Sequence, residues 1–191
     1  MIYHRSDAHE QSLEQDQLYR YDTPTVMILG VAGGNGLEHV DPMRLQAVYD
    51  VDINADYLRE CQRRYPKLQN VFQPIDADLS GKKIALPKAD LVIANLLIEY
   101  IGLDRFKEII SEMRLLYVSC IIQKSMEVTF VSDTPYANAL ECLDDLHRDI
   151  SETDLTAAMM DSGYQVKLRQ ETHLPNGKML CRIDFFDRLC T

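Results

Sequence analysis

Long apolar runs are missing from the sequence. No apolar segment in its 191 residues approaches the ~20 residues that a helix needs to cross a bilayer. The N-terminal residues 1–7 are polar and lack the apolar segment of a secretory signal. Linkers rich in Pro, Gly or Ser, low-complexity tracts and internal repeats are absent as well. We therefore expect a single cytoplasmic domain covering residues 1–191, with no membrane partner.

The sequence also lacks the spacings of a metal or disulfide framework. Its five cysteines include no CxxC pair, and its five histidines do not stand at metal-ligand spacing. Most of the cysteines fall in apolar periodic segments, where a free cysteine behaves as a small hydrophobic residue. We expect buried, reduced thiols and no metal site.

Positive charge is scarce. The chain has 20 Lys and Arg against 30 Asp and Glu, a formal net charge of −10 at pH 7. Such a field repels a phosphate backbone, which argues against nucleic acid as the main partner. Hydrophobic residues still make up 46% of the chain and charged residues 26%, the balance of a globular protein with a substantial core.

Short apolar runs alternate with helical patterns along the chain. Continuous apolar runs are typical of buried strands in a parallel sheet, and they cover residues 26–30, 47–51, 71–73, 91–94 and 117–122. Patterns of helical period, with caps and stops, cover residues 54–65, 104–116 and 151–163. Near the C-terminus, Asn176 and Gly177 form a strong hairpin signal between two further strand-like segments, 165–171 and 179–186. The pattern predicts alternating β and α units closed by an antiparallel hairpin.

A glycine-rich turn follows the first predicted strand. Residues 30–36 read Gly-Val-Ala-Gly-Gly-Asn-Gly and lead into a helix start at Leu37. Small residues let a ligand approach the backbone, and free N–H groups at a helix start favour polar ligand atoms. Many nucleotide-binding folds share this motif, and a tight turn without a ligand also explains it.

Acidic residues follow the next two predicted strands. Asp52 ends the second strand, where a carboxylate can accept both hydroxyls of an adenosine ribose. Residues 75–79 follow the third strand and bring polar and backbone groups to the place where an adenine would lie. Helix capping by Asp52 and turn chemistry at residues 75–79 are the structural alternatives.

This succession of motifs resembles the class I S-adenosylmethionine-dependent methyltransferases. The segments that match are residues 28–36, 51–54, 76–78 and 89–95, in the order and spacing of that family. The resemblance implies an α/β fold: a three-layer α/β/α Rossmann-like sandwich whose seven-stranded, mostly parallel sheet ends in an antiparallel C-terminal hairpin. It also implies S-adenosylmethionine as the cofactor and S-adenosylhomocysteine as the product.

The resemblance further implies which residues bind the cofactor. Gly30, Ala32 and Gly34 would line the methionine and ribose side of the cofactor, and Asp52 would hold the ribose hydroxyls. Ile53 would pack on the adenine, and Asp76 and Ala77 would contact its edge. Asn95 would lie below the methionine portion.

Two residues depart from the family pattern. Ile28 stands near the end of the first strand, where family members usually carry an acid, and Ala32 replaces the middle glycine of the turn. The missing carboxylate removes one expected partner of the cofactor's amino group. Ala32 also breaks the GxGxxG spacing of dinucleotide-dependent oxidoreductases, and the C-terminal hairpin fits the methyltransferase topology better. Methyl transfer is therefore the preferred interpretation.

Four tyrosines are candidates for contact with the methyl acceptor. Tyr100 follows the fourth strand, and Tyr136 lies in the insert after the fifth. Tyr19 and Tyr21 belong to an N-terminal helical segment, residues 1–22, of a kind that often folds over the cofactor in such enzymes. Simple packing of an aromatic ring explains each of them equally well. No catalytic residue is assigned, because in-line methyl transfer depends mainly on positioning.

Two functions stay open. The first is an active methyltransferase, monomeric or homodimeric, with a small-molecule acceptor, which the acidic surface favours over RNA or DNA modification. Glu99 is then a weak candidate for a general base, needed only if the acceptor must lose a proton. The second is a non-catalytic protein that binds S-adenosylmethionine or serves as a partner subunit, an alternative that the departures at Ile28 and Ala32 keep open.

Overall fold

The computed structural model describes residues 8–31, 34, 36–81, 84–124, 149–174 and 177–188. One seven-stranded sheet runs through them in the order β3-β2-β1-β4-β5-β7-β6. Its strands are β1 (Thr25–Leu29), β2 (Ala47–Asp52), β3 (Phe72–Asp76), β4 (Leu91–Asn95), β5 (Tyr117–Lys124), β6 (Tyr164–His173) and β7 (Met179–Asp187). Strands β1 to β5 pair in parallel, whereas β7 is antiparallel to both β5 and β6. The predicted sheet and its C-terminal hairpin are confirmed.

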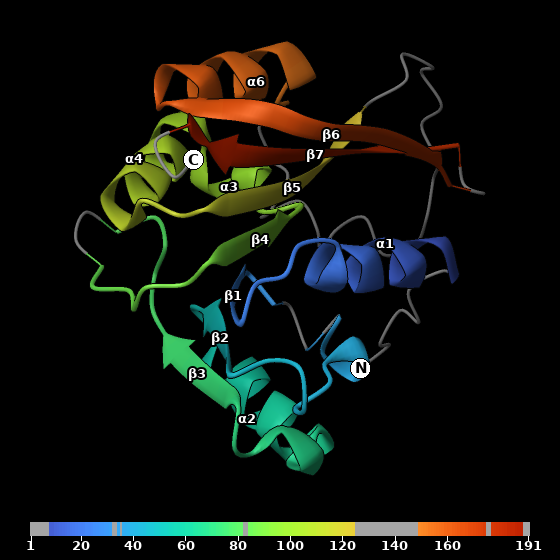
Figure 1. Cartoon of the computed structure of the whole chain (residues 1–191), viewed down its shortest axis with the longest axis vertical. Helices are drawn as coiled ribbons and strands as arrows, with labels where there is room; N and C mark the ends of the chain where they lie inside the picture. The colour runs from blue at the N-terminus through green and yellow to red at the C-terminus, as the bar shows by residue number, and fades with distance from the viewer. Residues whose placement is uncertain are drawn as a thin grey trace, which may run out of the picture.

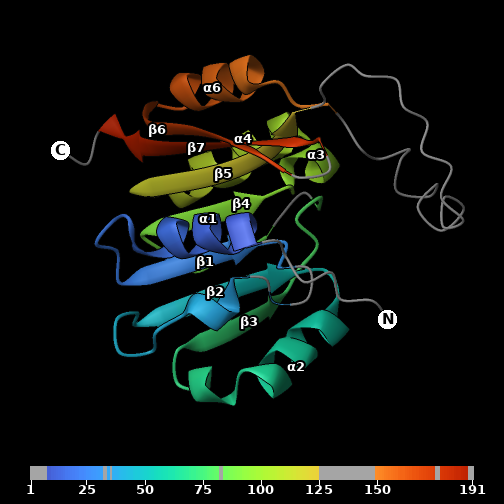
Figure 2. The same ribbon diagram turned by 90° about the vertical axis from the view of Figure 1, so that its right-hand side faces the viewer.

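Helices cover both faces of the sheet. They are α1 (Ala8–Tyr19), α2 (Ala55–Arg64), α3 (Ile98–Ile101), α4 (Leu103–Met113), α6 (Glu152–Asp161) and the short 3-10 helices η1 (Leu37–His39) and η2 (Pro66–Leu68). Helices α1, η1 and α2 pack on one face, and α4 and α6 pack on the other (Figure 1). Figure 2 shows α1 lying across the middle of the sheet. Within the described part of the chain, no helix has the length and apolar character needed to cross a bilayer.

Local sequence signals explain where the helices begin and end. The side chain of Asn54 accepts a hydrogen bond from the backbone N–H of Asp56 at 3.0 Å and so caps α2. Ser151 caps α6 in the same way, through the N–H of Asp154 at 3.0 Å. Helix η1 is a single turn, and the Asp41–Pro42 pair that follows it disfavours a longer helix.

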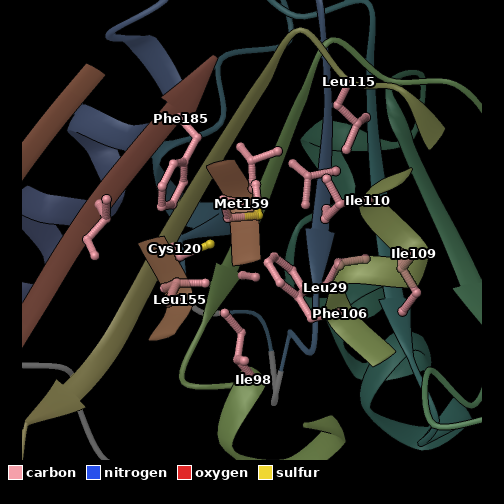
Figure 3. Close-up of a cluster of buried hydrophobic side chains, with 14 of the residues drawn as sticks. Leu29, Ile98, Phe106, Ile109, Ile110, Leu115, Cys120, Leu155, Met159 and Phe185 are labelled. Atoms are coloured by element: carbon pink, nitrogen blue, oxygen red, sulfur yellow. The ribbon is translucent and has the colours of Figure 1, made fainter. Parts of the chain in front are cut away.

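The face under α4 and α6 is an apolar core. Alternate residues of β1 divide between the two faces, so that Met27 and Leu29 point to this side. Figure 3 shows Leu29 with Phe106 of α4 and Leu155 of α6 in one cluster of buried side chains. Each such fully buried side chain contributes about 1.5–3 kcal/mol relative to an exposed one.

Three of the cysteines are buried in the core on one face or the other as free thiols. Cys61, Cys120 and Cys181 are buried and form no disulfide, which confirms the expectation for these three. Burial raises the pKa of Cys61 to about 12, so its thiol stays protonated near neutral pH. Cys142 and Cys190 lie outside the described residues.

The face under α1 carries a buried polar network. Arg182 of β7, 1% exposed, contacts Asp184 through two hydrogen bonds of 2.8 and 2.7 Å. Its third contact is a hydrogen bond of 2.6 Å to Asp16 of α1. Gln17 of α1 donates at 2.8 Å to Ser119 of β5, which in turn donates to Asp184. Directional contacts of this kind fix α1 in one position on the sheet.

Candidate functional site

A cavity of about 380 Å³ opens at the carboxyl ends of the central strands. In an open α/β sheet this is the edge where ligands bind, at the point where the strand order reverses, here between β1 and β4. The lining residues come from α1 (Leu13, Glu14), from β1 and its turn (Ile28, Leu29, Gly30, Val31), from β2 and α2 (Asp52, Tyr57), from the β4 end (Asn95, Leu96, Leu97, Tyr100) and from the strands β5 and β7 (Ile121, Leu180).

The glycine turn forms one wall of this cavity. Gly30 has a φ of +73°, and a Cβ there would lie 2.9 Å from Cδ1 of Leu97. Glycine is therefore required at this position, and its bare backbone faces the cavity. Glycine is favoured at position 34 for a different reason. Its φ is +98°, and a Cβ there would lie 3.0 Å from Sγ of Cys61 on α2. Gly34 packs the turn against α2 and does not line the cavity, and Ala32 lies outside the described residues.

Asp52 places a carboxylate on the β2 side of the cavity. The residue is 8% exposed, and its Oδ1 accepts a hydrogen bond of 2.8 Å from the backbone N–H of Asn54. Helix α2 is capped by Asn54, so Asp52 is not its N-cap. A carboxylate in this position can accept hydrogen bonds from both hydroxyls of a vicinal diol.

Asp50 is a second carboxylate, buried beneath the turn. It is a register partner of Ile28 in the neighbouring strand, and neither of its carboxylate oxygens has a hydrogen-bond partner among the described residues. Burial, and then the charge of Asp52, raise the pKa of Asp50 well above its ordinary value. Burial therefore disfavours the charged form of Asp50. Asp50 was not predicted as a site residue, and its signal in the sequence is an acid inside an apolar strand.

The residues predicted to meet an adenine lie next to Asp52 at the same edge of the sheet. Ala77 donates its backbone N–H to the carbonyl of Asp52 at 3.1 Å. Ile53 is 66% exposed, and Asp76 ends β3 as an exposed residue. None of the three lines the cavity itself, so their contact with an adenine stays a prediction.

The end of β4 forms the floor of the cavity. Asn95 exchanges two hydrogen bonds of 2.9 Å with Gln17, so its amide is turned toward α1. Leu96, the next residue, has a φ of +52°, which is sparsely populated for a leucine. Backbone strain of this kind costs about 1–3 kcal/mol and is often found at ligand sites. The N–H of Leu96 is held by the carbonyl of Ile121 at 2.8 Å.

Two of the four tyrosines predicted to meet the acceptor lie away from the cavity. The hydroxyl of Tyr19 donates to the carbonyl of His39 at 2.8 Å and accepts from the N–H of Asp41 at 2.7 Å. Tyr21 is buried, donates at 2.8 Å to Asp184, and stacks on Tyr117 at 4.2 Å between ring centroids. Both rings thus hold α1 and the chain after it in place. Neither lines the cavity, so their contact with an acceptor stays a prediction.

The other candidates for acceptor chemistry are placed differently. Tyr100 lines the cavity and is 44% exposed at its mouth. Helix α1 reaches the cavity through Leu13 and Glu14 instead of its tyrosines. Glu99 is buried against β5, where its Oε1 accepts from the N–H of Gln123 at 3.1 Å, and it does not line the cavity. Tyr136 lies outside the described residues.

The comparisons with known proteins bear on the fold. Neither a family model nor a curated protein matches the sequence. Solved structures do match. The N-methyltransferase NodS from Bradyrhizobium japonicum WM9, in complex with S-adenosylhomocysteine, has a TM-score of 0.69 at 11% identity, covering 96% of this chain and 90% of that one. The chain has the class I methyltransferase fold.

Two further methyltransferases show the same likeness. Magnesium protoporphyrin IX methyltransferase from Synechocystis PCC 6803, with bound S-adenosylhomocysteine, has a TM-score of 0.64 at 16% identity and covers 94% of this chain and 83% of that one. Geranyl diphosphate methyltransferase in complex with S-adenosylmethionine has a TM-score of 0.70 at 10% identity and covers 96% and 86%. At these identities the likeness establishes the fold, and the site must be argued from this chain's own residues.

The methyltransferase fold brings distant segments to one cavity. Leu13, Ile121 and Leu180 line it from α1, β5 and β7, and Tyr57 lines it from α2. These four residues were not predicted, because no local motif marks them. Leu13, Ile121 and Leu180 form one small apolar cluster together with Leu174. Their contribution becomes visible only when the strand order and the docking of α1 are known.

Proposed function

We propose that this protein is an S-adenosylmethionine-dependent methyltransferase whose cofactor binds in the cavity at the ends of β1, β2 and β4. The observation that carries the proposal is that Gly30, Asp52 and Asn95, at the ends of three separate strands, line one cavity of the methyltransferase fold. Structures with this fold have been solved with S-adenosylmethionine or S-adenosylhomocysteine bound.

The residues present suit the adenosyl part of this cofactor. Asp52 accepts hydrogen bonds from the two ribose hydroxyls. Gly30 lines the cavity without a Cβ, so the ligand can approach its backbone. Ile53 packs on the adenine, and Asp76 and Ala77 contact its edge. Asn95 lies below the methionine portion, with its amide held by Gln17.

The chemistry needs positioning more than a reactive side chain. S-adenosylmethionine supplies a methyl group on a sulfonium, which an acceptor nucleophile takes by in-line displacement while the sulfur keeps the electron pair of the broken bond. The protein must hold the acceptor at attack distance and exclude water. Leu13, Ile121 and Leu180 provide a dry wall for this on the α1 side of the cavity.

This apolar wall also indicates the acceptor. We place there a small molecule with an apolar body, entering past Tyr100 at the mouth of the cavity. Tyr100 orients or stacks on the acceptor. A general base is not assigned, because Glu99 faces β5 and not the cavity.

Calorimetric titration with S-adenosylmethionine, S-adenosylhomocysteine and NAD tests the cofactor. We expect Kd values on the order of 1 μM for the two adenosyl-sulfur ligands, about −8 kcal/mol, and no binding of NAD. Asp52→Ala removes hydrogen bonds from a charged partner and should weaken both ligands by about 10- to 100-fold. Asp56→Ala, an exposed acid of the first turn of α2, is the matched control and should leave both Kd values unchanged. Preference for NAD, or no binding of either ligand, would overturn the proposal.

A non-catalytic binding protein is the second candidate. The observation that favours it is Ile28, which brings an aliphatic side chain to the cavity where the methyltransferase family usually carries an acid. Turnover separates the two candidates in a screen of small-molecule acceptors. An enzyme produces S-adenosylhomocysteine with at least one acceptor, whereas a binding protein produces none with any of them.

A further inference from the structure

The cavity that Ile28 lines also contains a carboxylate from α1, that of Glu14. Ile28 lines both the main cavity and a small pocket that continues from it toward Gly36. Glu14 of α1 lines the same two spaces. The corner of the cavity where β1 provides no acid is therefore supplied with one from the helix above it.

The side chain of Glu14 lies against the glycine turn. A Cβ built at Gly36 would lie 3.7 Å from Cβ, Cδ and Oε2 of Glu14. A carboxylate oxygen of Glu14 also lies within 4.8 Å of a carboxylate oxygen of Glu38 and of a ring nitrogen of His39, both in η1. The carboxyl group of Glu14 is thus held between α1 and the start of η1, at the ligand-binding edge of the sheet.

The backbone of Glu14 is fixed by the contacts of Asp16 and Gln17, two and three residues further along α1. Asp16 accepts a hydrogen bond of 2.6 Å from the buried Arg182, and Gln17 exchanges two of 2.9 Å with Asn95 on the cavity floor. These contacts tie α1 to β7 and β4 within one turn of Glu14. A carboxylate held in advance in this way loses little freedom when it binds a ligand.

The two charged residues among those that line the cavity are Glu14 and Asp52. Asp52 stands on the β2 side, where the proposed function places the ribose. Glu14 stands on the side of β1 and β4, next to Asn95, where the methionine portion belongs. That portion carries an α-ammonium group, and a hydrogen bond between an ammonium and a carboxylate is among the strong ones in proteins.

We propose that Glu14 binds the α-ammonium group of the cofactor, in the role for which β1 offers only Ile28. The inference rests on the proposed function, because it requires an adenosyl-methionine ligand in the cavity. It assigns to α1 a direct contact with the cofactor, in addition to covering it.

Three ligands that lose charged groups in turn make the test. S-adenosylmethionine has the sulfonium and the α-ammonium, and S-adenosylhomocysteine has the α-ammonium but no sulfonium. 5′-Methylthioadenosine lacks the sulfonium and the whole amino-acid end, α-ammonium and α-carboxylate together. Calorimetry on Glu14→Gln should show the first two weakened about tenfold and 5′-methylthioadenosine unchanged within about twofold. Glu38→Gln is the matched control, because it removes a charge from the same corner but does not line the cavity. It should leave all three Kd values unchanged.

The pattern of losses distinguishes the explanations. Equal loss for all three ligands would mean that Glu14 only docks α1, and loss for S-adenosylmethionine alone would mean that it faces the sulfonium; each result overturns the inference. The inference is also overturned if the Glu14→Gln variant binds all three ligands with the affinity of the wild-type protein. A thermal unfolding curve for each variant checks that α1 remains docked. If the wild-type protein binds none of the ligands, the proposed function itself fails, which is a different result from failure of the Glu14 contact alone.

Discussion

The two faces of the sheet are built in different ways. The face under α4 and α6 is packed with apolar side chains such as Phe106 and Leu155, whose contacts are not directional. The face under α1 carries a buried ion pair, Arg182 with Asp184, joined to the helix by Asp16. A buried ion pair is a weak source of stability, because its desolvation offsets much of its attraction. Apolar clusters lie on both faces. We conclude that this apolar packing holds the fold together and that the polar network under α1 sets where the helix lies over the cavity.

Breaking the buried ion pair should have the largest effect. Arg182→Met leaves the carboxylate of Asp184 buried and without its main partner, which should lower the free energy of unfolding by about 3–5 kcal/mol. It also releases α1 at Asp16, so cofactor affinity should fall more steeply than stability alone explains. Urea unfolding and calorimetry measure the two effects. A variant that loses neither would show that the network does not position α1.

Truncating the apolar face should separate stability from binding. Leu155→Ala leaves a cavity between α6 and the sheet and should cost about 3 kcal/mol of unfolding free energy. Because Leu155 is remote from the ligand cavity, the Kd for S-adenosylhomocysteine should stay within about twofold below the unfolding temperature. A parallel loss of affinity would contradict the division of roles between the two faces.

The buried carboxyl group of Asp50 should make the stability of the protein depend on pH. Its pKa is raised in the folded protein, so its favourable contribution is complete below the unfolded pKa of about 3.9 and is lost as pH rises through the folded value. Asp50→Asn keeps the shape and removes the titration. Relative to wild type, the variant should gain stability as pH rises, by about 1.4 kcal/mol for each unit by which the pKa is raised. Urea unfolding over a pH series measures the difference, and a pH-independent difference would contradict an unpaired buried acid.

The smallest effect is expected at an exposed ion-pair cluster on the hairpin. Arg169 of β6 is 47% exposed and contacts Glu152 and Glu171. Arg169→Met should cost less than about 1 kcal/mol, and the cost should shrink at about 1 M salt. The comparison with Arg182→Met on the next strand isolates the effect of burial. A cost as large as that of Arg182→Met would remove the distinction.

The same cluster gives a prediction for acid. Hydrogen bonds from Arg169 and then Lys124 lower the pKa of Glu152 to about 2. A depressed folded-state pKa contributes stability above the unfolded value of about 4.3, and this contribution is lost as pH falls toward about 2. Glu152→Gln should therefore flatten the acid limb of the unfolding curve in that window. An unchanged acid limb would mean that the ion pairs contribute nothing in solution.

Features with a local signal could be predicted from the sequence. The strands, the C-terminal hairpin, the glycine turn and Asp52 all follow from periodicity or turn chemistry over a few neighbouring residues. Gly30 and Asp52 lie in the cavity as the spacing indicates. Asn95 does as well, although its amide is directed to Gln17, a partner that no motif reveals.

The N-terminal helical segment was predicted, but the docking of α1 on the sheet could not be predicted in the same way. The helix has few apolar residues on its buried face because part of that face is polar. Gln17 is fully buried there and forms hydrogen bonds with Asn95 and Ser119. Such pairs, far apart in the sequence, leave no periodic signal. The sequence therefore suggests Tyr19 and Tyr21 as cavity residues. Glu14, the acid that lines the cavity, cannot be distinguished in the sequence from the other charged residues of the helix.

A crystal structure of the complex with S-adenosylhomocysteine would locate the cofactor. We expect the ribose hydroxyls on Asp52 and the amino-acid end beside Gly30 and Asn95, beneath α1. A ligand bound elsewhere on the protein, or a cavity that remains empty at a saturating concentration of S-adenosylhomocysteine, would contradict this expectation.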